Sequence, residues 1–263
     1  MPVIQYLLIH VPTFLLGFIL VLFYVFSTII GLFIIRKFYP YKRCKDHNDI
    51  AGFIFATLGV IYAVVLAFTV IVTWEQFDKA DDITGREANC IASLNQDSIA
   101  FPAEFRARVQ GELRDYVNAI IHDEWKTMER GQRSSKVHDL QEKLVRSYSS
   151  FQPQNETQKI YLAESVKKLN EASELRRQRV LYASTGLHPI LYIILFIGSF
   201  ITISFTMLFG TENFTEHLIM ASLLAAMIAF TLFTIISLDY PFTGKYSIQP
   251  EVFIKILPTL LGK

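Results

Sequence analysis

The chain has 263 residues, of which 52% are hydrophobic, 14% aromatic and 19% charged. This composition is too apolar for one soluble domain and too charged for a bundle of membrane spans alone, so we expect both kinds of structure. The formal net charge is +1, which excludes nucleic-acid binding through a broadly basic surface. The two cysteines are too few for a disulfide framework.

Four stretches contain no Asp, Glu, Lys or Arg: 11–35, 50–74, 189–209 and 218–238. Each is long enough to cross a hydrocarbon core of about 30 Å. The first follows an N-terminus without a basic flank or a cleavage pattern, so it is expected to be a retained span rather than a signal peptide. We therefore predict an all-α, multi-pass protein in a lipid bilayer, placed in the bacterial inner membrane.

The polar sequence between the second and third spans predicts an inserted helical extramembrane domain. The second span enters polar sequence after Trp74 without a helix breaker, so we expect one helix to continue to about Ala100. Further helices are expected from Pro102 to Gly131 and over 134–149 and 156–184. The predicted organisation is 1–74 for two spans with a basic linker, 75–187 for the helical domain, 188–238 for a transmembrane hairpin and 239–263 for a tail.

The second span has a patterned surface when it is drawn as a helix with about 100° per residue. Small residues occupy one side and predict close packing against another helix: Gly52, Ala56, Gly59, Ala63 and Ala67. Bulky apolar residues lie opposite. A neighbouring stripe carries Tyr62, Thr69 and Thr73, whose hydroxyls either hydrogen-bond to neighbouring helices and their own backbone or line a water-filled path.

Two features flank this span. Asn48 or Asp49 is expected to cap its first turn, because a short side-chain oxygen can accept from the unpaired amides there. The preceding linker is basic, and the short-loop charge rule would place it in the cytoplasm. Its basic residues are Arg36, Lys37, Lys42, Arg43 and Lys45. Counting the basic residues of the helical domain reverses that balance, so the side that this domain faces stays open.

The sequence contains no motif for catalysis or cofactor binding. There is no glycine-rich phosphate loop, nucleophile elbow or paired-cysteine metal motif. His138 and Glu142 share a helix face, but two such residues are interpreted as an exposed face rather than a metal site. The spans hold no ionisable acid or base, which disfavours a proton-driven transporter. We expect neither an enzyme nor a cofactor.

Several runs resemble the signature of a large bacterial and plant family of unknown function described as bestrophin-like. They are His47-Asn48-Asp49-Ile50-Ala51-Gly52-Phe53, Trp74-Glu75-Gln76-Phe77, Arg86-Glu87-Ala88-Asn89 and Leu238-Asp239-Tyr240-Pro241-Phe242-Thr243-Gly244. The resemblance covers nearly the whole chain and its order of elements.

In the bestrophin anion channels, which share this layout, five subunits surround a pore lined by the second span. The resemblance implies a homo-oligomer that conducts small ions, with Tyr62, Phe68, Thr69 and Thr73 as candidate pore-lining residues. The sequence lacks three aromatics at successive four-residue steps and an acidic cluster suited to calcium, so calcium gating is not expected. The alternative is a non-conducting membrane scaffold or sensor whose helical domain binds a partner.

Overall fold

The computed structural model describes residues 3–38 and 47–261. Within these ranges all regular secondary structure is helical. Three of the five basic linker residues that carry the orientation argument, Lys42, Arg43 and Lys45, lie outside the described residues, as does Cys44.

Four helices are long and apolar enough to cross a membrane, as predicted. They are α2 (Thr13–Phe38), α4 (Asn48–Asp97), α9 (Pro189–Thr206) and α10 (Phe214–Leu238). The expectation that the second span continues as one helix into polar sequence is confirmed, because α4 is 50 residues long. Pro189 opens α9 in the first turn, where its missing N–H leaves no hydrogen bond unmade.

The described chain divides into two compact units. The first comprises Met1–Ile9, Gln76–Thr185 and Tyr240–Lys263, and the second comprises His10–Glu75 and Gly186–Asp239. Helix α4 contributes its apolar half to the second unit and its polar half to the first.

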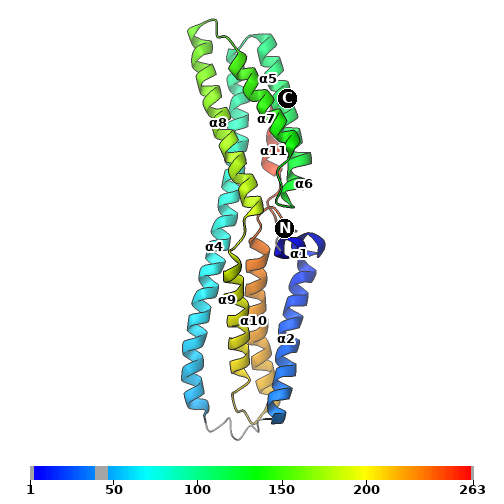
Figure 1. Cartoon of the computed structure of the whole chain (residues 1–263), viewed down its shortest axis with the longest axis vertical. Helices are drawn as coiled ribbons and strands as arrows, with labels where there is room; N and C mark the ends of the chain where they lie inside the picture. The colour runs from blue at the N-terminus through cyan, green and yellow to red at the C-terminus, as the bar shows by residue number, and fades with distance from the viewer. Residues whose placement is uncertain (1–2, 39–46, 262–263) are drawn as a thin grey trace. The chain divides into compact units, whose positions relative to one another are not determined.

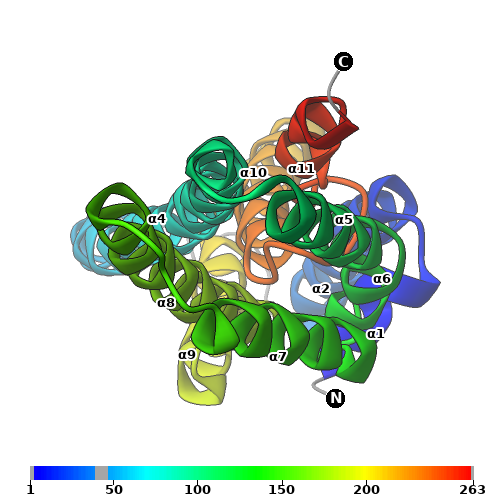
Figure 2. The same ribbon diagram turned by 90° about the horizontal axis from the view of Figure 1, so that it is seen from above.

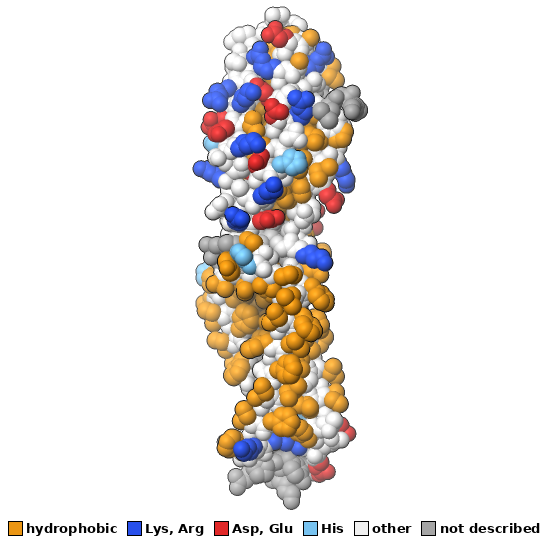
Figure 3. All heavy atoms as spheres, turned by 90° about the vertical axis from the view of Figure 1, so that its right-hand side faces the viewer, with side chains coloured by type: hydrophobic (Ala, Val, Ile, Leu, Met, Phe, Trp, Pro, Cys, Tyr) orange, Lys and Arg blue, Asp and Glu red, His pale blue; other side chains and the backbone are white. Residues whose placement is uncertain are grey.

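The second unit is built from α2, α9, α10 and the apolar half of α4 (Figure 1). Helix α10 lies along α2, and small side chains allow the close approach, since Ala225 and Ala229 are fully buried. Gly17 serves the same purpose on α2, because a β-carbon there would lie 2.9 Å from the ring of Phe233. Hydrophobic side chains cover the face of this unit that Figure 3 shows, and all four helices carry exposed large apolar side chains, as is usual where the solvent is lipid.

The first unit gathers the polar half of α4 with α1 (Val3–His10), α5 (Ala103–Ala119), α6 (Trp125–Met128), α7 (Ser135–Ser150), α8 (Glu156–Ser184) and α11 (Glu251–Ile256). Helix α7 packs against both α5 and α8 (Figure 2). Ser134 and Asn155 cap α7 and α8 by accepting from backbone N–H groups of the first turn. Helices α1 and α11 had not been predicted.

The region from Pro102 to Gly131 differs from the single regular helix expected there. A π-helical segment, Ile120–Glu124, separates α5 from α6. The chain then turns at Gly131, whose φ of 67° is a conformation that glycine adopts without steric cost. The expected stop at Gly131 is therefore present, but the helix before it carries one widened turn.

Candidate functional site

The hydroxyl stripe of α4 faces the chain's own helices. Tyr62, Thr69 and Thr73 are all buried. The Tyr62 hydroxyl donates to the carbonyl oxygen of Leu195 at 2.9 Å, and Thr69 donates to the carbonyl of Val65 at 2.8 Å. Thr73 likewise donates to the carbonyl of Thr69 at 3.0 Å. Of the two roles considered for the stripe, these contacts match hydrogen bonding to helices rather than the lining of a water-filled path. Three of the four candidate pore residues therefore lie inside the helix bundle of one chain.

The fourth candidate, Phe68, lies elsewhere on the helix. Its side chain is 66% exposed in the single chain. The face of α4 opposite the buried stripe is also exposed and is apolar throughout, with Val60, Val64 and Ile71 along it. A conduit at α4 would therefore meet this apolar face and Phe68, rather than the hydroxyl stripe.

Along most of its length, the small-residue side of α4 is left open by the described part of the chain. A β-carbon added at Gly52 or Gly59 would have no neighbour within 4 Å. Ala56, Ala63 and Ala67 are exposed. The surface that the sequence predicts for helix packing is thus available to another molecule.

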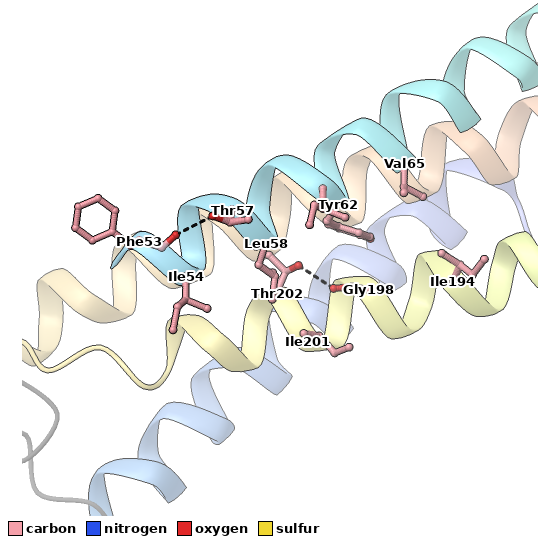
Figure 4. A pocket seen from close by; sticks show the side chains of 11 residues that line it. Phe53, Ile54, Thr57, Leu58, Tyr62, Val65, Ile194, Gly198, Ile201 and Thr202 are labelled. Atoms are coloured by element: carbon pink, nitrogen blue, oxygen red, sulfur yellow. Dashed lines mark hydrogen bonds between the residues drawn. The ribbon is translucent and has the colours of Figure 1, made fainter. Parts of the chain in front are cut away.

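On its other flank, α4 forms an apolar groove with α9 (Figure 4). The groove has a volume of about 590 Å³ and is lined mainly by aliphatic side chains, including Leu58 and Ile201. The hydroxyls of Thr57 and Thr202 donate to carbonyls of their own helices, at 3.1 and 2.8 Å. Because these donors are already used, the groove suits an apolar occupant.

The start of α4 is fixed in a way that the sequence did not indicate. The Asn48 side chain does not cap the helix but pairs with the backbone of Gly210, donating to its carbonyl at 2.8 Å and accepting from its N–H at 2.9 Å. The reason is that α4 already begins at Asn48, and the carbonyl of His47 accepts the first helical hydrogen bond, from Ala51. Asp49 is exposed in the first turn, where its charge favours the helix N-terminus.

The first unit contains a buried network of four charged side chains. Glu87 on α4 and Glu124 in the π-helical segment face Arg176 and Arg179 on α8. Arg179 donates to Glu87 at 2.6 and 3.0 Å and to Glu124 at 2.9 Å. Arg176 donates to Glu124 at 2.5 to 3.1 Å. Glu87, Glu124 and Arg179 have no exposed surface, so the two negative and two positive charges balance inside the protein.

The two carboxylates of this network differ in their electrostatics. Burial raises the pKa of Glu87, and the attraction of Arg179 only partly offsets it. Burial would also raise the pKa of Glu124, but Arg179 and Arg176 outweigh it and hold this pKa below its usual value. The guanidinium of Arg179 also lies over the rings of Trp125 and Phe253, 5.1 and 5.5 Å from their centroids.

The structure corrects the interpretation of the arginine cluster on α8. A run of arginines such as Arg176, Arg177 and Arg179 in a sequence suits either lipid headgroups or a solvated helix face. Arg176 and Arg179 are buried and serve neither role. Only Arg177 is exposed, and it pairs with Glu174. One feature of the sequence could have indicated this burial. Glu124 lies between the apolar residues Ile120 and Met128, and a buried acid at that position needs a buried basic partner.

No candidate metal site emerges from the residues that the structure describes, where no three His, Cys, Asp or Glu side chains gather. His138 and Glu142 lie 3.4 Å apart on the surface of α7, with about half of each side chain exposed. They form a surface pair, as interpreted from their spacing.

Comparisons with known proteins agree with these observations. A family model described as the Bestrophin-like domain matches residues 6–253. Two crystal structures of mutants of a bacterial Bestrophin homolog from Klebsiella pneumoniae are similar, with 14% and 16% identity and TM-scores of 0.72 and 0.74. The aligned region covers 93% and 94% of this chain and 99% and 98% of theirs.

Another structure, described as a membrane protein, has a TM-score of 0.70 at 15% identity, covering 94% of this chain and 97% of that one. A comparison with curated proteins finds no match. The likeness in fold extends over both units and all four apolar helices. This chain belongs to the Bestrophin-like family of membrane proteins.

Proposed function

We propose that the chain is one subunit of a homo-oligomeric ion channel in which copies of α4 surround the conduit. The observation that carries this proposal is the small-residue side of α4, which no part of the described chain covers. Small residues at four-residue spacing allow close helix approach, and lipid chains gain little from such a surface. A neighbouring subunit is the occupant that best fits it.

The two flanks of α4 differ, which favours a ring. One flank carries the small residues from Gly52 to Ala67, and the other borders the apolar groove that α4 forms with α9. If the small-residue flank of one copy contacts the groove flank of the next copy, each interface joins two different surfaces. Repeated contacts of this kind close into a ring when the rotation allows it.

In such a ring the conduit meets the remaining face of α4. Val60, Val64 and Ile71 lie about 160–200° around the helix from the buried Tyr62, at 100° per residue. Phe68 borders this face. Apolar side chains of this kind form a constriction that closes by losing its water. Tyr62 supports the wall from behind through its hydrogen bond to the Leu195 carbonyl on α9.

The conducted species is proposed to be a small anion, by the resemblance to the bestrophin channels, and the membrane to be the bacterial inner membrane. The proposal requires no cofactor. The polar half of α4, with α5 to α8, is proposed to lie outside the bilayer.

The decisive experiment is conduction by the purified protein in planar bilayers, combined with imaging of its oligomer. The expected result is stepwise ionic current from a ring whose innermost helices are copies of α4. A monomer or dimer that passes no current would overturn the proposal and would instead support a non-conducting scaffold.

A further inference from the structure

A small basic cavity lies in the first unit, between the loop that follows α6 and the facing sides of α7 and α8. Its volume is about 260 Å³. Three arginines and a histidine stand among its six lining residues, and none of the six is acidic: Arg133, His138, Gln141, Arg176, Arg177 and Val180.

One of these groups is a fixed hydrogen-bond donor. Arg176 is 6% exposed and is held rigidly by Glu124, by Gln141 and by the carbonyl of Ser134. A guanidinium has five N–H donors. Those contacts use four of them and, within the described chain, leave one N–H of Nη1 without a partner. The same nitrogen donates to Gln141 at 2.7 Å, and both Arg176 and Gln141 line the cavity.

The other cations at the cavity are exposed and only partly neutralised. Arg133 forms no ion pair with any residue that the structure describes. Arg177 pairs with Glu174 one turn earlier on α8, and both side chains are more than half exposed. His138 faces Glu142, 3.4 Å away. Exposed pairs of this kind are weak and can give way to a ligand of higher charge.

The dimensions and the charge together identify the class of ligand. Pockets for drug-sized molecules usually exceed about 300 Å³, so this cavity suits a compact group. The planar fork of arginine matches the oxygen atoms of phosphate. We propose that this cavity binds a phosphate group, either free in solution or at the end of a larger molecule such as a lipid. The site is independent of the proposed conduit.

The test uses the full chain in an uncharged detergent, titrated with inorganic phosphate while chloride keeps the ionic strength constant. Binding is followed by calorimetry and by the shift in melting temperature. Arg133→Ala and Arg177→Ala should each weaken phosphate binding roughly 10- to 100-fold, since each removes one charge-assisted contact. Arg133→Lys should restore part of the affinity. Arg108→Ala, at an exposed arginine on α5, is the matched control.

A second arm distinguishes the source of the phosphate group. Mixed micelles with phosphatidic acid are compared with micelles that contain phosphatidylcholine, in competition with inorganic phosphate. If phosphatidic acid displaces inorganic phosphate and phosphatidylcholine does not, the ligand is a lipid phosphate. If neither lipid displaces inorganic phosphate, the ligand is a soluble phosphate. The proposal is overturned if phosphate stabilises the wild type no more than chloride does, or if both alanine variants bind phosphate as the Arg108→Ala control does.

Discussion

The ring of Tyr62 on α4 lies directly against the backbone of Gly198 on α9. A β-carbon at Gly198 would be only 2.5 Å from Cε2 of Tyr62, closer than real contacts allow. The absence of a side chain lets the ring approach, so that the Tyr62 hydroxyl reaches the carbonyl of Leu195. This contact ties α4 to the rest of the second unit.

Gly198→Ala is therefore expected to destabilise the chain. The added methyl group must displace a buried ring, which costs about 1–3 kcal/mol in a packed interior. The measurement is thermal unfolding of the purified protein. Gly85→Ala is the control, because a β-carbon there has no neighbour within 4 Å and alanine favours a helix by about 1 kcal/mol. Because alanine brings the same helix preference at both positions, a Gly198 variant that gains as much stability as the Gly85 control would contradict the contact.

Gly59→Leu should leave the stability of the single subunit unchanged and weaken the oligomer instead. Nothing in its own chain lies within 4 Å of a β-carbon at this position, so the isolated subunit should fold and melt normally. A bulky side chain would keep a neighbouring helix at a distance and should shift the oligomer toward monomer. Light scattering of the detergent complex measures this shift. An intact oligomer would show that the small-residue side is not an interface.

Val64→Ser tests the proposed conduit. A hydroxyl in an apolar constriction favours water there, so the single-channel conductance or the open fraction should increase. The matched control is Ile30→Ser on α2, also at an exposed apolar position. Planar-bilayer recordings compare the two variants with wild type. The face of α4 assigned to the conduit would be wrong if both variants conduct as wild type does.

Glu124→Gln is expected to destabilise the first unit strongly. The substitution leaves Arg176 and Arg179 buried with only Glu87 to balance them, and breaking a buried pair in this way costs about 3–5 kcal/mol. Thermal unfolding at neutral pH measures the effect. Glu142→Gln, at an exposed position on α7, should change stability by less than about 1 kcal/mol.

The same network predicts a dependence on acid. The folded pKa of Glu124 lies below its unfolded value of about 4.3. Its stabilising contribution is therefore present above about pH 4.3 and is lost as the pH falls through the folded pKa. Glu87 has the opposite pH dependence, because its folded pKa is raised. Its contribution to stability is present below its unfolded pKa and is lost as the pH rises through its folded pKa.

The measurement is the melting temperature of wild type and Glu124→Gln between about pH 7 and pH 3. The difference between the two proteins should narrow on the acid side, once Glu124 of wild type becomes protonated. A constant difference over this whole range would show that Glu124 does not act through its charge.

The four apolar helices could be predicted because uninterrupted apolar runs allow little else in a bilayer. The helix ends at Pro189 and Gly131 were also readable, since these residues act through local geometry that each residue type carries with it. Helices α1 and α11 were missed because they are short and depend on distant partners. One example is Gln5, whose side chain donates to the carbonyl of Ala183 at 3.1 Å.

The orientation of α4 within the bundle could not be read from its sequence. A helical wheel separates its surfaces but does not say which surface meets the chain's own helices and which meets a neighbour. The choice depends on Gly198 and Leu195, more than 130 residues further along the chain. The buried charges were missed for a similar reason, because Glu87 and Arg179 become partners only after folding.

The widened turn at Ile120–Glu124 makes the charge network depend on chain length as well as on residue type. One residue accounts for about 100° of helical rotation, so a regular α-helix over the same residues would present Glu124 and Trp125 to α8 at a different angle. The loop before α7 would be displaced with them. Insertions and deletions in this segment should therefore be tolerated far less than substitutions on its exposed face.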